Sequence, residues 1–135
     1  MEKFKAKCWI EKRHKMYDVL QIMIKEDGTS CLIKNDGKTA EEELYDELYD
    51  FWVIGVEPLL YTGRNDMNGK EIYEGDILFN SFFGDYWIVA YEKGSFILKL
   101  NNSKHFEYLS YVTGFKGSAF KKVGTIYENP ELLKW

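Results

Sequence analysis

The sequence YTGRNDMNGKEIYEGDI, residues 61–77, shows where this chain turns and where its strands begin. The Asn-Gly pair at 68–69 favours a type I′ turn, because both residue types tolerate a positive φ angle. A second turn is expected around Gly63 and Asp66, since an aspartate can accept a hydrogen bond from its own backbone. The Glu-Gly-Asp corner at 74–76 then leads into an apolar run. The segment therefore predicts tight turns that join short strands.

Turn geometry leaves four charged residues of this segment unexplained: Arg64, Lys70, Glu71 and Glu74. We expect them to be exposed along one connected edge, and they are candidates for binding a partner. Most exposed charges only interact with solvent. If residues 61–77 carry a site, we expect it at these positions.

The acidic residues of the segment do not fit a known catalytic or metal-binding pattern. A calcium loop needs oxygen ligands at alternate positions and a closing bidentate Glu, which Asp66, Glu71, Glu74 and Asp76 do not provide. Glycoside hydrolysis needs a carboxyl group of raised pKa beside an ionised one, and nothing here predicts that pair. The sequence therefore predicts no catalytic residue, no metal site and no cofactor.

Strands dominate the rest of the chain. Extended runs separated by Gly, Asp, Asn or Ser predict strands at 4–10, 16–25, 30–34, 52–56, 77–80, 86–91, 96–100, 107–112 and 121–127. The Asp-Gly pair at 27–28 predicts a tight hairpin between the second and third of these. One helix is expected over 39–51, where Thr39 and Glu42 form a capping box.

These elements predict a mainly β fold, with an α+β fold as the minor alternative. Closely spaced short strands in the second half indicate a small barrel or a strongly bent sheet. We expect an N-terminal subdomain over 1–58, with the helix, and a C-terminal subdomain over 59–135. One continuous domain is the alternative.

Composition narrows the class of protein further. Aromatic residues make up 17% of the chain, which favours pleated sheets. The formal net charge of −4 argues against general attraction to nucleic acid. A basic N-terminal end that includes Lys12, Arg13 and Lys15 keeps nucleic-acid binding as an alternative.

Cys8 and Cys31 fit no zinc spacing and are expected to be buried. No secretory signal or membrane span is recognisable, so a cytoplasmic location is expected.

The aromatic run FFGDYW, residues 82–87, is a candidate for packing or for an interface. Single-stranded nucleic acid stacks on such aromatic residues only beside a basic groove, whereas the neighbours here are mostly acidic. An aromatic turn that a small fold cannot bury favours self-association. The candidate partner-binding residues are Phe82, Phe83, Tyr86 and Trp87.

Five stretches of the chain resemble the YopX family of phage and prophage proteins: FKAKCW (4–9), KMY (15–17), residues 61–77, YWIV (86–89) and VGTIYENPELL (123–133). The resemblance implies a mainly β protein with an SH3-like barrel in its C-terminal half, encoded by a phage or prophage, and usually oligomeric. It brings no established catalytic residues. One departure is Ile10, which stands where an acidic residue usually follows the opening Trp.

We therefore expect a phage accessory protein that acts by binding and that self-associates in the cytoplasm of a bacterial host. Its partners are expected to be a second copy of the chain and a phage or host protein, and not a membrane. A nucleic-acid-binding module is the alternative. An enzyme is least favoured, because it would need a deep pocket where Asp66, Glu71, Asp76 or His105 converge.

Overall fold

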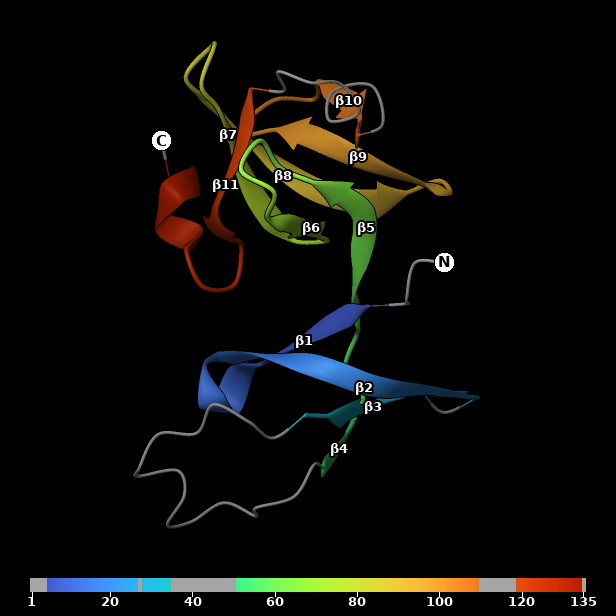
Figure 1. Cartoon of the computed structure of the whole chain (residues 1–135). Helices are drawn as coiled ribbons and strands as arrows, with labels where there is room; N and C mark the ends of the chain where they lie inside the picture. The colour runs from blue at the N-terminus through green and yellow to red at the C-terminus, as the bar shows by residue number, and fades with distance from the viewer. Residues whose placement is uncertain (1–4, 27, 35–50, 110–118, 135) are drawn as a thin grey trace. The chain divides into compact units, whose positions relative to one another are not determined.

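A computed structural model describes residues 5–26, 28–34, 51–109 and 119–134 of the chain. The predicted mainly β class is confirmed: the described residues form eleven strands and two short 3₁₀ turns, η1 (Glu11–Arg13) and η2 (Pro130–Leu133). The chain divides into two compact units (Figure 1), an N-terminal unit over Lys5–Leu59 and a C-terminal unit that includes the described residues from 60 onward.

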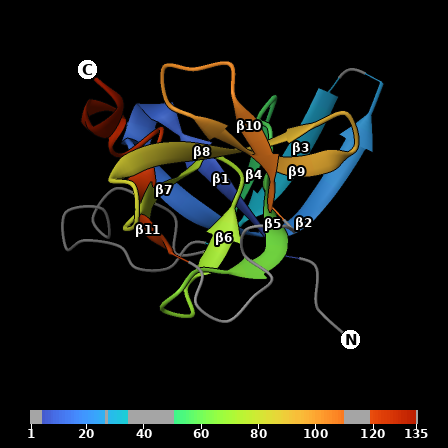
Figure 2. The same cartoon turned by 90° about the horizontal axis from the view of Figure 1, so that it is seen from above.

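The N-terminal unit is an antiparallel sheet with the strand order β4-β3-β2-β1. Its strands are β1 (Ala6–Ile10), β2 (Lys15–Lys25), β3 (Gly28–Ile33) and β4 (Phe51–Ile54). Figure 2 shows the long hairpin of β2 and β3, in which Lys25 lies opposite Gly28. The predicted hairpin at this position is confirmed.

The core of the N-terminal unit contains both cysteines of the chain. Cys8, Tyr17, Cys31 and Ile33 form a buried cluster, and the two thiols are free and have no exposed surface. Burial, with a smaller contribution from nearby Cys31, raises the pKa of Cys8 to about 11. The expectation that the cysteines act as small buried apolar groups is confirmed.

The predicted helix over 39–51 lies outside the described residues except at its last position. There the prediction is wrong, because Phe51 begins β4 and pairs with Ile33 of β3. The strand that follows was predicted correctly, although it ends at Ile54 rather than at Val56.

The C-terminal unit combines a hairpin with an antiparallel five-stranded sheet. The hairpin consists of β5 (Leu59–Asn65) and β6 (Glu71–Tyr73). The sheet strands, in chain order, are β7 (Asp76–Asn80), β8 (Asp85–Glu92), β9 (Ser95–Leu100), β10 (Phe106–Tyr108) and β11 (Phe120–Thr125).

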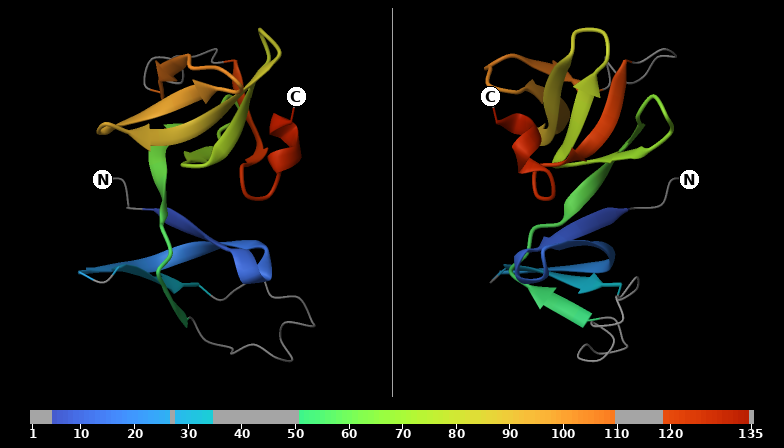
Figure 3. Two further views of the ribbon diagram at one scale, coloured as in Figure 1. Left: turned by 180° about the vertical axis from the view of Figure 1, so that it is seen from behind. Right: turned by 90° about the vertical axis from the view of Figure 1, so that its left-hand side faces the viewer.

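The five-stranded sheet has the order β10-β9-β8-β7-β11, so the last strand returns to pair with the first (Figure 3). The expected small barrel is not closed, since β10 and β11 are the two ends of this sheet among the described strands. Residues that alternate along the strands face the core, as sheet geometry requires. The core members are Ile72, Leu78, Trp87, Val89, Leu98, Leu109 and Phe120.

The Glu-Gly-Asp corner before β7 requires its glycine. Gly75 has a φ angle of +83°, which is unfavourable for a residue with a side chain. Its N–H donates to the Val89 carbonyl (2.9 Å), and its carbonyl accepts from the Ile126 N–H (2.8 Å). A Cβ atom at this position would lie 2.9 Å from the Cε2 atom of Tyr127. The corner is therefore held on both sides with no room for another atom.

We predict that Gly75→Ala destabilises the C-terminal unit much more than Gly69→Ala does. Both glycines have similar positive φ angles, but a Cβ on Gly69 would meet nothing within 4 Å. Gly69→Ala should therefore cost only the backbone strain, about 1 kcal/mol. Gly75→Ala adds the overlap with Tyr127 and should cost roughly 2 to 4 kcal/mol. Urea unfolding followed by far-UV circular dichroism measures both changes, and equal costs would contradict the role assigned to Tyr127.

Candidate functional site

The Asp66 carboxylate organises the turn that joins β5 to β6. Its Oδ1 atom accepts hydrogen bonds from the N–H groups of Asn68 (2.8 Å) and Lys70 (2.9 Å). Its Oδ2 atom accepts from the N–H group of Lys122 (2.8 Å), 56 residues further along the chain. Asp66 is buried, so these three donors replace the water that the charge has lost.

Asp66 also explains why the predicted type I′ turn at 68–69 is wrong. Only Gly69 has a positive φ angle (+80°), whereas a type I′ turn needs it at both central residues. The Gly69 N–H donates to the Asp66 carbonyl, and the Asp66 N–H donates to the Lys70 carbonyl. The loop is thus a turn from 66 to 69 closed by a left-handed glycine, and the Asp66 side chain holds Asn68 in it.

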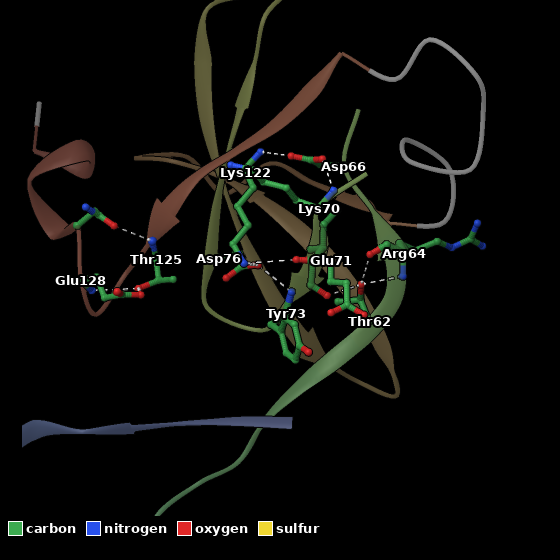
Figure 4. Close-up of polar contacts among 12 residues, drawn as sticks. Thr62, Arg64, Asp66, Lys70, Glu71, Tyr73, Asp76, Lys122, Thr125 and Glu128 are labelled. Atoms are coloured by element: carbon green, nitrogen blue, oxygen red, sulfur yellow. Dashed lines mark hydrogen bonds and ion pairs between the residues drawn. The ribbon is translucent and has the colours of Figure 1, made fainter. Parts of the chain in front are cut away.

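Lys122 connects this turn to a second buried carboxylate (Figure 4). Its Nζ atom lies 2.9 Å from Oδ2 of Asp76 and donates to the Glu71 carbonyl (3.3 Å). The same Asp76 oxygen accepts the Tyr73 N–H (2.8 Å). One residue of β11 therefore binds Asp66 through its backbone and Asp76 through its side chain.

The hydrogen bonds at Asp66 set the direction of its pKa. Burial by itself would raise the pKa, but the N–H groups of Lys122, Lys70 and Asn68, with the charge of Lys70, lower it below the ordinary value of 3.8. Since the folded pKa is depressed, the contribution of Asp66 to the free energy of unfolding is complete above that ordinary value. It is lost as the pH falls through the lower folded pKa.

We predict that Asp66→Asn lowers stability at pH 7 by about 2 kcal/mol, because one carboxylate oxygen becomes a donor that faces another donor. The variant should also lose less stability than the wild type between about pH 5 and pH 2. Urea unfolding at a series of pH values measures both effects. Parallel pH profiles for the two proteins would show that Asp66 is not responsible.

We predict that Lys122→Met destabilises the protein by about 3 kcal/mol, because it leaves Asp76 charged and buried without its cation. Lys121→Met is the matched control, since Lys121 lies next along β11 and is exposed. The control should change the free energy of unfolding by less than about 0.5 kcal/mol. Equal costs for the two variants in urea unfolding would contradict this role of Lys122.

The four charged candidates of residues 61–77 do not share one environment. Arg64 and Lys70 are exposed, whereas Glu71 and Glu74 are half-buried. Oε1 of Glu74 accepts the Leu60 N–H at 3.3 Å, and the Glu74 N–H donates to the Leu60 carbonyl. Glu74 therefore has a structural role, and the accessible charges of the segment are Arg64 and Lys70.

The four aromatic candidates also differ in how far they are exposed. Trp87 lies in the core with 6% of its surface exposed, and its indole N–H donates to the Asp85 carboxylate (2.7 Å). Tyr86 is half-buried beside Phe79. Phe82 and Phe83 are 84% and 77% exposed, with ring centroids 5.9 Å apart. We call these two residues the aromatic tip. They lie in the turn between β7 and β8, and this turn projects from the C-terminal sheet in Figure 1.

Backbone contacts fix the aromatic tip. Oδ1 of the buried Asn80 accepts the N–H groups of Phe82 (2.8 Å) and Phe83 (3.2 Å). The Gly84 N–H donates to the Asn80 carbonyl (2.8 Å), and Gly84 has a φ angle of +73°. Ser81 donates from its N–H and its hydroxyl to the Ala119 carbonyl. The two phenylalanines are thus exposed on an ordered turn.

The basic candidates lie where β1 passes into β2. Lys12 and Arg13 belong to η1 and are exposed, and half-buried Lys15 begins β2. Arg13 donates to the Tyr17 hydroxyl (3.4 Å), and Nζ of Lys15 lies 5.2 Å from the Tyr17 ring centroid. Two of the three cations therefore contact the same tyrosine.

The other titratable side chains in the described part of the chain lie apart from one another or in pairs. Across the described ranges, no group of three or more His, Cys, Asp or Glu residues is placed to hold a metal ion. His14 occupies the turn between β1 and β2 with a φ angle of +50°, and His105 pairs with Glu107 (2.9 Å) at the surface. No helix in the described part of the chain has the length and apolar character to cross a membrane.

The chain is a mainly β protein with two small antiparallel units, and Lys122 of its last described strand binds two buried aspartates, Asp66 and Asp76. The family model described as "YopX protein" matches residues 3–134, and the chain therefore belongs to the YopX family. The resemblance noted in the sequence is confirmed. No curated protein matches the chain.

One solved structure with a similar fold is that of protein EF1440 from Enterococcus faecalis. It aligns with a TM-score of 0.56 and 24% sequence identity, over 99% of this chain and 100% of the other. At that identity the similarity supports the fold only.

Proposed function

We propose that this protein is a phage or prophage accessory protein that acts as a binding module and self-associates through its aromatic tip. The observation that carries the proposal is the exposure of Phe82 and Phe83. Large apolar side chains that stand together in water mark interaction sites. Asn80 holds the turn in place, so little conformational entropy is lost when a partner covers it.

A hollow beside the aromatic tip gives a second copy a place to bind. It has a volume of about 340 Å³ and is lined by Gly84, Asp85, Tyr86, Leu100, Asn101 and Asn102. Tip and hollow adjoin, because Gly84 follows Phe83 directly. A two-fold dimer needs a surface that complements itself, and a projection next to a hollow meets that need. Each copy would place its tip in the hollow of the other.

We predict that the protein with Phe82→Ser and Phe83→Ser has lost its self-association. Burying a phenylalanine contributes about 2 kcal/mol, so losing both should weaken association roughly a thousandfold. Phe106→Ser is the control, since Phe106 is a half-exposed phenylalanine of the same unit. Size-exclusion chromatography with light scattering measures the mass of each protein. A monomeric wild type, or a double variant that associates as strongly as the wild type, would overturn the proposal.

Mixing two variants distinguishes tip-in-hollow contact from other modes of association. Asn102→Arg adds a long charged side chain at the rim of the hollow and leaves the tip intact. Alone, neither this variant nor the Phe82→Ser, Phe83→Ser protein can form the contact. Their mixture regains one of the two contacts, so a heterodimer should appear in native mass spectrometry. If the wild type associates but the mixture does not, the surface used is a different one.

A further inference from the structure

A second hollow in the C-terminal unit has a different chemical character. Thr62 and Arg64 of β5, Ser95 and Phe96 of β9, and Tyr108 and Leu109 line it. Its volume is about 220 Å³, smaller than the 300 Å³ or more typical of sites for drug-sized ligands. The space is therefore suited to a group about the size of one amino-acid residue.

An irregular stretch of β5 places Arg64 at this hollow. Tyr61 pairs with Tyr73 and Asn65 with Glu71, so residues 62–64 together oppose the single residue Ile72. Such bulges turn side chains in new directions and are common beside functional sites.

Thr62 fixes the conformation of this bulge. Its hydroxyl donates to the Ile72 carbonyl (2.8 Å) and accepts the Arg64 N–H (3.2 Å). Between them, Gly63 has a φ angle of +80°. The backbone that carries Arg64 is thus set before any ligand binds, which reduces the entropy lost on binding.

Among the described residues that line the hollow, the only charged side chain is the cation Arg64. None of the six lining residues is acidic. Among the described residues, no ion pair or hydrogen bond involves the Arg64 guanidinium, and its side chain points away from Asp66, Lys122 and Asp76 (Figure 4). An arginine has a planar set of donors that can bind both oxygens of a carboxylate at once.

The remaining lining is partly apolar. Leu109 is 2% exposed and belongs to the core, and Phe96 packs against that core. Tyr108 and Ser95 add hydroxyl groups. A cation and hydroxyls over an apolar base suit a ligand with one charged end and an apolar body, whereas a free phosphate has no apolar body to bury.

We propose that this hollow binds a carboxylate carried on an aromatic or apolar body, with Arg64 as the anion-binding residue. Two sources share that chemistry: a free aromatic acid and the C-terminal carboxylate of a peptide that ends in an apolar residue. The site is separate from the aromatic tip, so it does not depend on the proposed self-association.

The test titrates the full-length protein, labelled with ¹⁵N, with 3-phenylpropionate and with the peptide acetyl-Gly-Gly-Phe. We expect saturable amide shifts at Thr62, Ser95, Phe96 and Tyr108, with a Kd on the order of 1 mM or lower. The matching amides, 3-phenylpropionamide and acetyl-Gly-Gly-Phe-amide, should bind at least about tenfold more weakly. Tighter binding of the acid identifies a free ligand, and tighter binding of the peptide identifies a chain end.

Two variants show whether Arg64 is responsible. Arg64→Gln should weaken carboxylate binding at least about tenfold, with the amide spectrum otherwise that of the folded protein. Lys70→Gln is the matched control, because Lys70 is an exposed cation of the same segment that does not line the hollow. Equal binding of acids and amides, an unchanged Kd in Arg64→Gln, or no saturable shift at the lining residues would overturn the proposal.

Discussion

Lys122 is the residue on which the arrangement of the C-terminal unit depends. It binds the buried Asp66 through its backbone and the buried Asp76 through its ammonium group, and these aspartates lie at the two ends of the β5–β6 turn and the following corner. Burying charge is costly unless nearby groups replace the lost water. Here the N–H groups of Asn68, Lys70 and Tyr73 complete that replacement, and no buried side-chain nitrogen or oxygen of the described residues lacks a partner. The aspartates are therefore committed to holding the chain in place.

Backbone carbonyls at and just before the start of β11 accept hydrogen bonds from two turns that are remote in sequence. The Met67 N–H, in the β5–β6 turn, donates to the Phe120 carbonyl, and the Ser81 N–H, in the β7–β8 turn, donates to the Ala119 carbonyl. In each turn a buried side chain, Asp66 or Asn80, accepts the N–H groups that the loop leaves unpaired. The same device thus orders the turn that follows Arg64 and the turn that carries the aromatic tip, while Thr62 fixes the backbone of Arg64 itself. These two ordered turns thus lie beside or carry exposed side chains, Arg64, Phe82 and Phe83, that do not contribute to the core.

The sequence predicts local features of this protein better than distant contacts. Alternation and turn residues were sufficient to predict most strands, the β2–β3 hairpin and the corner at 74–76. The predicted type I′ turn at 68–69 was wrong, because the Asp66 side chain competes with the intrinsic preference of Asn-Gly for that turn. The importance of Lys122 could not be predicted, since its partners lie 46 and 56 residues earlier and only the pairing of β11 with β7 brings them together. Trp87 and Phe82 looked equivalent in sequence, but Trp87 faces the core from β8, whereas Phe82 lies in the exposed turn between β7 and β8.

The two buried cysteines make it possible to measure how often the N-terminal unit opens. Both thiols of the chain lie in that unit, fully covered, and the raised pKa of Cys8 keeps it protonated near neutral pH. Only a thiolate reacts quickly with alkylating reagents. The rate of alkylation in native buffer therefore reports how often this unit opens, with no signal from the other half of the molecule. A time course of mass spectra can therefore follow the opening of the N-terminal sheet by itself.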